Sequence, residues 1–280
     1  MRADQLLVER GMAASRSQAV RLIAGGLRWR DAGSSDAWRD VVKNRDDLPE
    51  SAELDLVDGA EARYVSRGGL KLEGALKTAG IDATGLQCLD IGQSTGGFTD
   101  CLLQHGAAKV VGVDVGHGQL HAKLREDERV IAVEKVNARA LTAVDLIASS
   151  VDAEDDVETM EIEFEPRFDL IVGDLSFISL TLVLPAVVPF LAADGRMLML
   201  VKPQFELQPG QVGKGGIVRD AAMYPIVEAR LREACAALGL RVVQWFDSPI
   251  VGGDGNHEFF VHAVRADGAP GAGDAPSAQL

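Results

Sequence analysis

The sequence has few cysteines, few aromatic residues and no apolar run of membrane-spanning length. The three cysteines, Cys88, Cys101 and Cys235, form no C-x-x-C pair, which argues against a disulfide framework or a cysteine-rich zinc site. The apolar run at 178–193 contains two prolines and is shorter than the roughly 20 residues of a membrane span. Residues 1–5 are not followed by the apolar region of a signal peptide. We therefore expect a cytoplasmic protein without a membrane span.

Positive charge is also scarce, because 28 basic residues stand against 42 acidic ones. The net charge of −14 by itself argues against a nucleic-acid partner. The charges are unevenly spread, however: residues 1–30 carry six arginines against two acids, whereas residues 145–165 carry nine acids and no base. We interpret 145–165 as a solvated insertion that lies away from any nucleic-acid surface, and the Gly-, Ala- and Pro-rich residues 266–280 as a disordered tail.

The 280 residues, 47% of them apolar, suffice for a large domain and a small one. In the first 60 residues, a helix is expected at 2–10, and Ser15 opens a second helix with the Ser-x-x-Gln spacing of a capping box. Two glycines, 25–26, end that helix, and weak strand signals follow at 27–30 and 52–57. We predict a compact helix-pair module that presents arginines at 1–60, followed by a linker at 61–67.

Residues 86–265 alternate between short β-like runs and helical runs, which predicts an α/β fold for the catalytic region at 68–265. We expect a seven-stranded, Rossmann-like sheet that is mostly parallel, with an antiparallel last strand because no helix fits between the last two strands. The expected strands are 87–91, 110–114, 130–134, 168–172, 197–201, 242–246 and 259–264, and the expected helices are 98–105, 118–126, 138–149, 180–191 and 221–238.

A glycine-rich turn at 90–99 joins the first strand of this region to its first helix, where glycines let the backbone approach a ligand. Its spacing is not the G-x-G-x-x-G of a dinucleotide site, and the acid Asp90 would repel a pyrophosphate but suit an ammonium group. We therefore favour S-adenosylmethionine over a nicotinamide cofactor and over a purely structural turn, with Asp114 on the ribose hydroxyls and Asn137 near the adenine. The predicted cofactor residues are Asp90, Gly92, Ser94, Gly96, Gly97, Phe98, Asp114, Val115, Asn137 and Asp174.

Two other patterns carry weaker signals. His117 and His121 have the i, i+4 spacing of a metal pair but lack the Glu of H-E-x-x-H, so we expect no metal site. The run 209–216 fails the spacing of a P-loop and is better interpreted as a flexible basic loop beside a cleft, with Lys214 as its cation.

Three ionisable residues stand at the ends of apolar strands: Asp174, Lys202 and Glu258. In a doubly wound sheet with an antiparallel last strand, all three reach the carboxyl edge, where ligands bind. A single ionisable residue at a strand end is more often merely solvated. Three such residues at one edge of the sheet, beside a cofactor-binding turn, favour a catalytic role. A lysine that is partly removed from water and lies near a second cation can act as a base.

Six motifs, at 63–72, 90–99, 113–116, 174–179, 201–206 and 255–258, together resemble the TlyA family. Members are known both as haemolysins and as ribosomal RNA 2′-O-methyltransferases, and the resemblance covers about residues 1–265. It implies an FtsJ-like catalytic domain whose Lys-Asp-Lys-Glu tetrad falls on Lys71, Asp174, Lys202 and Glu258. It also implies an N-terminal domain like that of ribosomal protein S-four. The residues expected to contact RNA are Arg2, Arg16, Arg21, Arg67 and Lys214.

The expected function is methyl transfer from S-adenosylmethionine to a ribose 2′-hydroxyl of ribosomal RNA, within ribosomal subunits. Lys202 is the candidate base or orienting group, Asp174 and Glu258 tune it, and Lys71 holds the substrate end. We expect a monomer. Two rivals remain: a membrane-active haemolysin, and an RNA-binding ribosome-assembly factor whose transferase fold is inactive.

Overall fold

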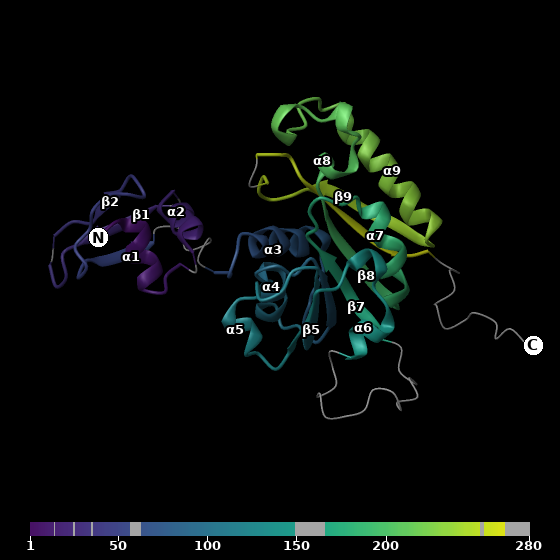
Figure 1. Cartoon of the computed structure of the whole chain (residues 1–280), viewed down its shortest axis with the longest axis horizontal. Helices are drawn as coiled ribbons and strands as arrows, with labels where there is room; N and C mark the ends of the chain where they lie inside the picture. Colours follow the sequence, from purple (N-terminus) through teal and green to yellow (C-terminus); the bar gives the residue numbers. More distant parts are fainter. Residues whose placement is uncertain are drawn as a thin grey trace, which may run out of the picture. The chain divides into compact units, whose positions relative to one another are not determined.

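A computed structural model describes residues 1–13, 15–24, 26–34, 36–56, 63–148, 166–252 and 255–266. Most of the predicted acidic insertion, the predicted tail beyond residue 266 and part of the predicted linker lie outside these ranges. The contacts divide the chain into two compact units, 1–70 and 71–280, which are considered separately below (Figure 1).

The first unit pairs two short helices with a small antiparallel sheet. Helix α1 (Ala3–Glu9) and helix α2 (Arg16–Ala24) contact each other, and the Ser15 hydroxyl accepts the Gln18 backbone N–H at 3.3 Å, as its spacing predicts. The strands are β1 (Leu27–Arg30), β2 (Arg39–Val41) and β3 (Glu53–Leu56), in the order β2-β1-β3. Strand β2 was not predicted. The core is apolar, with both helices packed on the sheet through buried residues that include Leu6, Leu7, Leu22, Ile23 and Leu27.

The second unit is built on a seven-stranded sheet in the order β6-β5-β4-β7-β8-β10-β9. Strand β10 is antiparallel to both of its neighbours and the other pairs are parallel, so the predicted sheet is confirmed. Its strands are β4 (Gln87–Ile91), β5 (Lys109–Asp114), β6 (Val130–Glu134), β7 (Phe168–Gly173), β8 (Leu191–Val201), β9 (Leu240–Asp247) and β10 (Phe259–Arg265).

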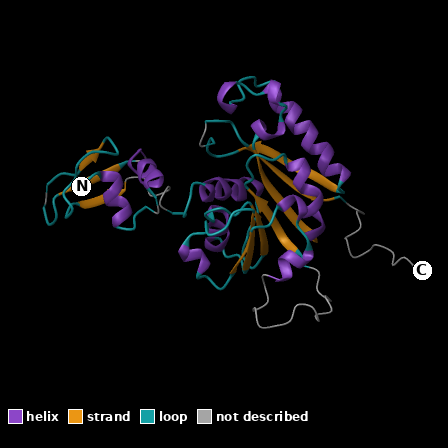
Figure 2. Ribbon diagram, in the orientation of Figure 1, coloured by secondary structure: helices purple, strands orange, loops and turns teal. Residues whose placement is uncertain are grey.

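Helices cover both faces of this sheet (Figure 2). One apolar core joins the sheet to α6 (Ala143–Ala148), α7 (Leu180–Val187) and α9 (Met223–Ala237), while α3 (Gly68–Ala79) and α4 (Gly97–Gln104) lie on the other side. Two very short helices, α5 (Ala122–Arg125) and α8 (Pro203–Glu206), follow β5 and β8.

Three predicted elements are corrected by the structure. The helix expected at 118–126 is reduced to α5, because Gly118 adopts a positive φ of 66°. The helix expected at 138–149 is a 3₁₀ turn, Ala138–Ala140, followed by α6, because Leu141 is extended. Strand β8 starts at Leu191 rather than at 197, through a register shift against β7.

Candidate active site

A cavity of about 370 Å³ opens at the carboxyl edge of the sheet, between the turn after β4 and the ends of β5, β6 and β7. Of the residues predicted to hold a cofactor, six line this cavity. They are Gly92, Ser94, Asp114, Val115, Asn137 and Asp174. The structure therefore brings these six together at the edge where α/β folds bind ligands.

The glycine turn and the end of β5 hold each other through the Asp114 carboxylate. Its Oδ2 accepts the backbone N–H of Ser94, and its Oδ1 that of Gly116, both at 2.7 Å. Gly92 has a φ of 85°, and a Cβ on it would lie 2.7 Å from the backbone oxygen of Asp174. A glycine is thus required here, since any side chain would push the turn away from the strand that carries Asp174.

Asp90 lies beneath the turn rather than on the cavity wall. It is fully buried; its Oδ2 accepts the Thr99 hydroxyl at 2.7 Å, and that hydroxyl also accepts from Gln93 Nε2 at 3.0 Å. Its Oδ1 has no hydrogen-bond partner among the described residues. Burial raises the pKa of Asp90 to about 7, opposed by the hydrogen bond from Thr99. A carboxylate in this state offers negative potential to a cation bound above it.

The other three predicted cofactor residues shape the start of α4 and are not among the lining residues. Gly96 has a φ of 94°, and a Cβ there would meet the Leu124 side chain at 2.3 Å. Gly97 begins the helix, and Phe98 is buried with its ring stacked on Phe260 at 6.3 Å. These residues fix the geometry of the turn, whereas the sequence pattern suggested that they would contact the ligand.

The four predicted catalytic residues form two adjacent ion pairs at this edge. Lys202 Nζ lies 2.5 Å from Asp174 Oδ1, with side-chain exposures of 12% and 24%. Lys71 Nζ, on α3, lies 2.5 Å from Glu258 Oε2, with exposures of 9% and 3%. Burial raises the pKa of Glu258 above its usual range, while Lys71 and then Lys202 act in the opposite direction. Both lysines therefore act electrostatically on the same buried carboxylate.

Two residues that follow Asp174 were missed by the sequence reasoning. Lys202 Nζ donates to the Ser176 hydroxyl at 2.9 Å, so Ser176 completes the surroundings of this ammonium group. Phe177 is 92% exposed, has a φ of 64° and lies 5.1 Å from the Phe205 ring, between centroids. Both line the cavity. Their position directly after Asp174, a predicted catalytic residue at a strand end, was the available signal.

The loop that carries these two residues is held from below by Glu206. The buried Glu206 carboxylate accepts the Leu180 N–H at 2.7 Å and the Ser179 hydroxyl at 2.5 Å. Burial raises its pKa, against the effect of both hydrogen bonds. Glu206 thus joins α8, which follows Lys202, to the first turn of α7, which follows Asp174.

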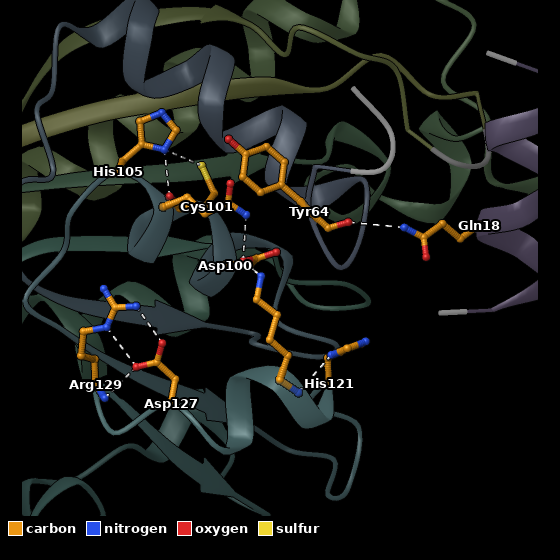
Figure 3. Close-up of polar contacts among 10 residues, drawn as sticks. Gln18, Tyr64, Asp100, Cys101, His105, His121, Asp127 and Arg129 are labelled. Carbon is orange, nitrogen blue, oxygen red and sulfur yellow. Dashed lines mark hydrogen bonds and ion pairs between the residues drawn. The ribbon is translucent and has the colours of Figure 1, made fainter. Parts of the chain in front are cut away.

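The histidine pair contributes to local structure. His121 Nδ1 accepts the Lys123 N–H at 3.2 Å and so caps α5, and Lys123 Nζ reaches Asp100 of α4 at 3.2 Å (Figure 3). Arg129 and Asp127 form a further pair after α5 at 2.7 Å. Within the described ranges, no three His, Cys, Asp or Glu residues gather as a metal site.

Two of the arginines predicted to bind RNA, Arg2 and Arg16, have an acidic partner in the first unit. Arg2 and Arg16 both reach the buried Asp4, at 2.8 and 3.3 Å. The hydrogen bond from Arg2, supported by Arg16, lowers the pKa of Asp4 although burial acts in the opposite direction. The Arg21 side chain lies outside the description, Arg67 is partly buried just before α3, and Lys214 is exposed in the second unit. Gln18 fastens α2 to the Tyr64 backbone oxygen at 3.4 Å (Figure 3).

A mostly parallel seven-stranded sheet with one antiparallel strand, and an acid-and-glycine turn below a cavity at its carboxyl edge, define a Rossmann-like methyltransferase. The chain belongs to the FtsJ-like methyltransferase family, which residues 64–265 match, and within it to the TlyA group.

Three relatives illustrate this membership. The 16S/23S rRNA (cytidine-2′-O)-methyltransferase TlyA of Mycobacterium tuberculosis is 41% identical, over 98% of this chain and 95% of its own. Hemolysin A of Brachyspira hyodysenteriae is 36% identical, over 94% of this chain and 100% of its own. A solved structure from Streptococcus thermophilus, titled as a haemolysin, superposes with a TM-score of 0.68 at 37% identity, covering 95% of this chain and 89% of its own. Among the described helices, none has the length and apolarity to cross a membrane.

The methyl donor is therefore S-adenosylmethionine. The residues present fit this molecule in three respects. The cavity lies at the correct edge of the sheet, the Asp114 carboxylate retains acceptor capacity for ribose hydroxyls, and the unpartnered Oδ1 of Asp90 supplies negative potential below the turn. This negative potential would attract the ammonium group in the amino-acid part of S-adenosylmethionine.

Proposed function

We propose that this protein transfers a methyl group from S-adenosylmethionine to a ribose 2′-hydroxyl of ribosomal RNA. The observation that carries the proposal is the position of Lys202, whose ammonium group lies between Asp174 and Ser176 at the edge of the cofactor cavity. The named activity of the Mycobacterium tuberculosis relative supports both the substrate and the attacking atom.

S-adenosylmethionine supplies an electrophilic methyl group, and the protein must bring a weak oxygen nucleophile to it. Lys202 holds the 2′-oxygen in line by a hydrogen bond, which contributes alignment. As the oxygen–methyl bond forms and the methyl–sulfur bond breaks, Lys202 gives one ammonium proton to the Asp174 carboxylate and takes the hydroxyl proton in its place. Asp174 positions the lysine, and its carboxylate is the final proton acceptor.

The second ion pair serves the substrate side. Lys71 is positioned by Glu258 and places a second positive charge near Lys202, because both lysines act on the Glu258 carboxylate. In our proposal this charge binds the sugar–phosphate backbone of the target nucleotide, because ammonium groups are suited to phosphate oxygens. Glu258 keeps the local charge balanced, since two lysines in one pocket would otherwise repel each other.

Phe177 gives the site a surface suited to a nucleobase. Single-stranded RNA is commonly recognised by aromatic rings on which unpaired bases stack. The Phe177 side chain is 92% exposed, lines the cofactor cavity and directly follows Ser176, which accepts the hydrogen bond from Lys202, so its ring is accessible to a bound nucleotide. We propose that the target base, turned out of its helix, stacks on Phe177.

We further propose that residues 1–60 form the RNA-binding module, that 68–265 form the catalytic domain and that 61–67 connect them. The first unit carries the cluster of arginines around α1 and α2, while the tetrad belongs to the second. RNA would bind this module mainly through phosphates and shape.

The decisive experiment compares wild type with Lys202→Ala on ribosomal subunits that lack the modification, with methylated riboses mapped on the RNA. We expect Lys202→Ala to lose at least about a hundredfold in rate, the low end of the contribution of a positioned acid or base, while calorimetry shows unchanged cofactor binding. Lys77→Ala, an exposed lysine at the end of α3, is the matched control and should retain full activity.

Near-normal methylation by Lys202→Ala would refute its assigned role. A wild-type protein that binds RNA but never binds the cofactor would support the inactive assembly factor. Leakage of liposomes, equal in wild type and Lys202→Ala, would support the haemolysin.

A further inference from the structure

A second basic element lies at the same edge of the sheet, in the loop between α8 and α9 (Figure 1). Residues 208–219 of this loop contain two exposed cations, Lys214 and Arg219, neither of which forms an ion pair with a described residue. Arginines such as Arg129 and Arg232, by contrast, have carboxylate partners within 2.7 Å. Unpaired cations beside a catalytic site are available to an anionic substrate.

The two cations flank one tight turn. Gly215 and Gly216 both adopt positive φ angles, 80° and 79°, and the Gly213 N–H donates to the Ile217 oxygen at 2.9 Å, which closes the turn. The Cγ and Cδ atoms of Arg219 lie 3.8 Å from the position that a Cβ on Gly213 would occupy. The stem of Arg219 therefore packs against the turn whose tip is Lys214.

Asn256 fastens this turn to the strand that carries the catalytic glutamate. Its Oδ1 accepts the Val218 N–H at 3.0 Å, its Nδ2 donates to the Gly216 oxygen at 2.9 Å, and it is only 1% exposed. It stands two residues before Glu258. A displacement of this amide therefore displaces the loop relative to the tetrad.

We infer that the 208–219 loop is a phosphate-binding element of the RNA site, and that Asn256 is the positioning residue that sets its distance from the catalytic pair. This inference rests on the proposed function, because it names the part of the substrate that lies next to the methylated ribose. The ligand is the RNA backbone, since two cations on a glycine turn suit phosphate groups and carry no information on the base.

The test measures kcat, KM for ribosomal subunits and the salt dependence of RNA binding for Lys214→Ala/Arg219→Ala. Each phosphate contact contributes about 0.9 to the logarithmic salt slope, which is about eightfold in affinity at 0.1 M salt. We expect KM to rise by about that factor per lost contact, a slope reduced by about 1 to 2, and little change in kcat. The charge-matched control is Lys109→Ala/Arg241→Ala at the amino ends of β5 and β9, and it should leave all three values unchanged.

Asn256→Ala should reproduce the higher KM, and adding it to the double variant should cause little further loss, because both act on one element. Asn256→Asp, which keeps the acceptor for Val218 but loses the donor to Gly216, should have an intermediate effect. All variants should bind S-adenosylmethionine as wild type does.

An unchanged KM and salt slope in Lys214→Ala/Arg219→Ala, with active wild type, would overturn the phosphate-binding role alone. A loss of kcat at constant KM in Asn256→Ala would show that Asn256 acts through Glu258 rather than through the loop. Inactive wild-type protein would instead count against the proposed function itself.

Discussion

Asp90 is fully buried, and one of its carboxyl oxygens has no hydrogen-bond partner in the part of the chain that the structure describes. Its pKa rises from 3.8 to about 7 because burial disfavours the charged form. The folded protein therefore binds a proton that the unfolded chain has already released between those two pH values. By linkage, this group does not change the free energy of unfolding below about pH 4, where it is protonated in both states. It lowers the free energy of unfolding increasingly as the pH rises from there towards 7.

Asp90→Asn should accordingly stabilise the cofactor-free protein in a pH-dependent way. The gain should be small near pH 4, grow up to about pH 7 and then level off at no more than about 4 kcal/mol, from about 1.4 kcal/mol per pKa unit. Thermal unfolding of both proteins from pH 4 to 8 measures it. The Thr99 hydroxyl keeps an acceptor in this variant.

The same substitution should weaken cofactor binding above pH 7, by about tenfold or more, because the ammonium group loses its negative partner. Wild-type affinity should rise with pH through 7 and that of the variant should not. A stability difference independent of pH would contradict the raised pKa.

Glu206 matters at the scale of elements, because it joins the loop after β7 to the helix after β8. Glu206→Ala would leave the Leu180 N–H and the Ser179 hydroxyl buried without an acceptor, at a cost of about 1–3 kcal/mol for each group. We expect a lower midpoint of thermal unfolding and, because the loop with Ser176 and Phe177 loses its support, reduced methylation. Glu206→Gln retains a carbonyl acceptor for Leu180 and should recover much of both.

Rescue by glutamine is the diagnostic result for Glu206. If Glu206→Gln were as inactive as Glu206→Ala while both melted like wild type, the carboxylate would have a chemical role rather than a positioning one.

The elements differ in how far the sequence could predict them. The parallel strands were predictable because they are buried on both faces and form short apolar runs, and Asp174 and Lys202 follow two of them. Glu258 directly precedes the antiparallel strand β10, whose apolar run was equally visible. Helix α3, which carries Lys71, was not predicted as a helix, since three of its residues are glycines. Two of these are required by packing: a Cβ would lie 2.2 Å from Tyr64 at Gly69 and 2.7 Å from Pro249 at Gly74.

The position of some site residues depends on tertiary contacts and could not be predicted from the sequence. Asp90 was assigned to the ligand because of its place in the turn, but burial by α4 puts it below the cavity. Ser176 and Asn256 lie within the motifs at 174–179 and 255–258, but the sequence assigned neither residue a role of its own. Their roles follow only from distances to Lys202 and to the 208–219 loop.

At the scale of the whole molecule, a net charge of −14 must be reconciled with an RNA substrate. The arginines of the first unit and the unpaired cations of the 208–219 loop give two separate basic regions, so the total charge says little about binding. Arg16 tests the first region. Its side chain is 56% exposed, and Asp4 would keep its pair with Arg2 if Arg16 were removed.

Arg16→Ala should therefore weaken RNA binding about eightfold at 0.1 M salt and reduce the salt slope by about 1, while the first unit stays folded. Filter binding to ribosomal RNA at several salt concentrations measures both quantities. Arg129→Ala is the matched control, because it also removes an arginine paired with an aspartate, but one after α5 in the second unit. Equal losses in the two variants would show that the effect comes from net charge, and not from a binding surface on the first unit.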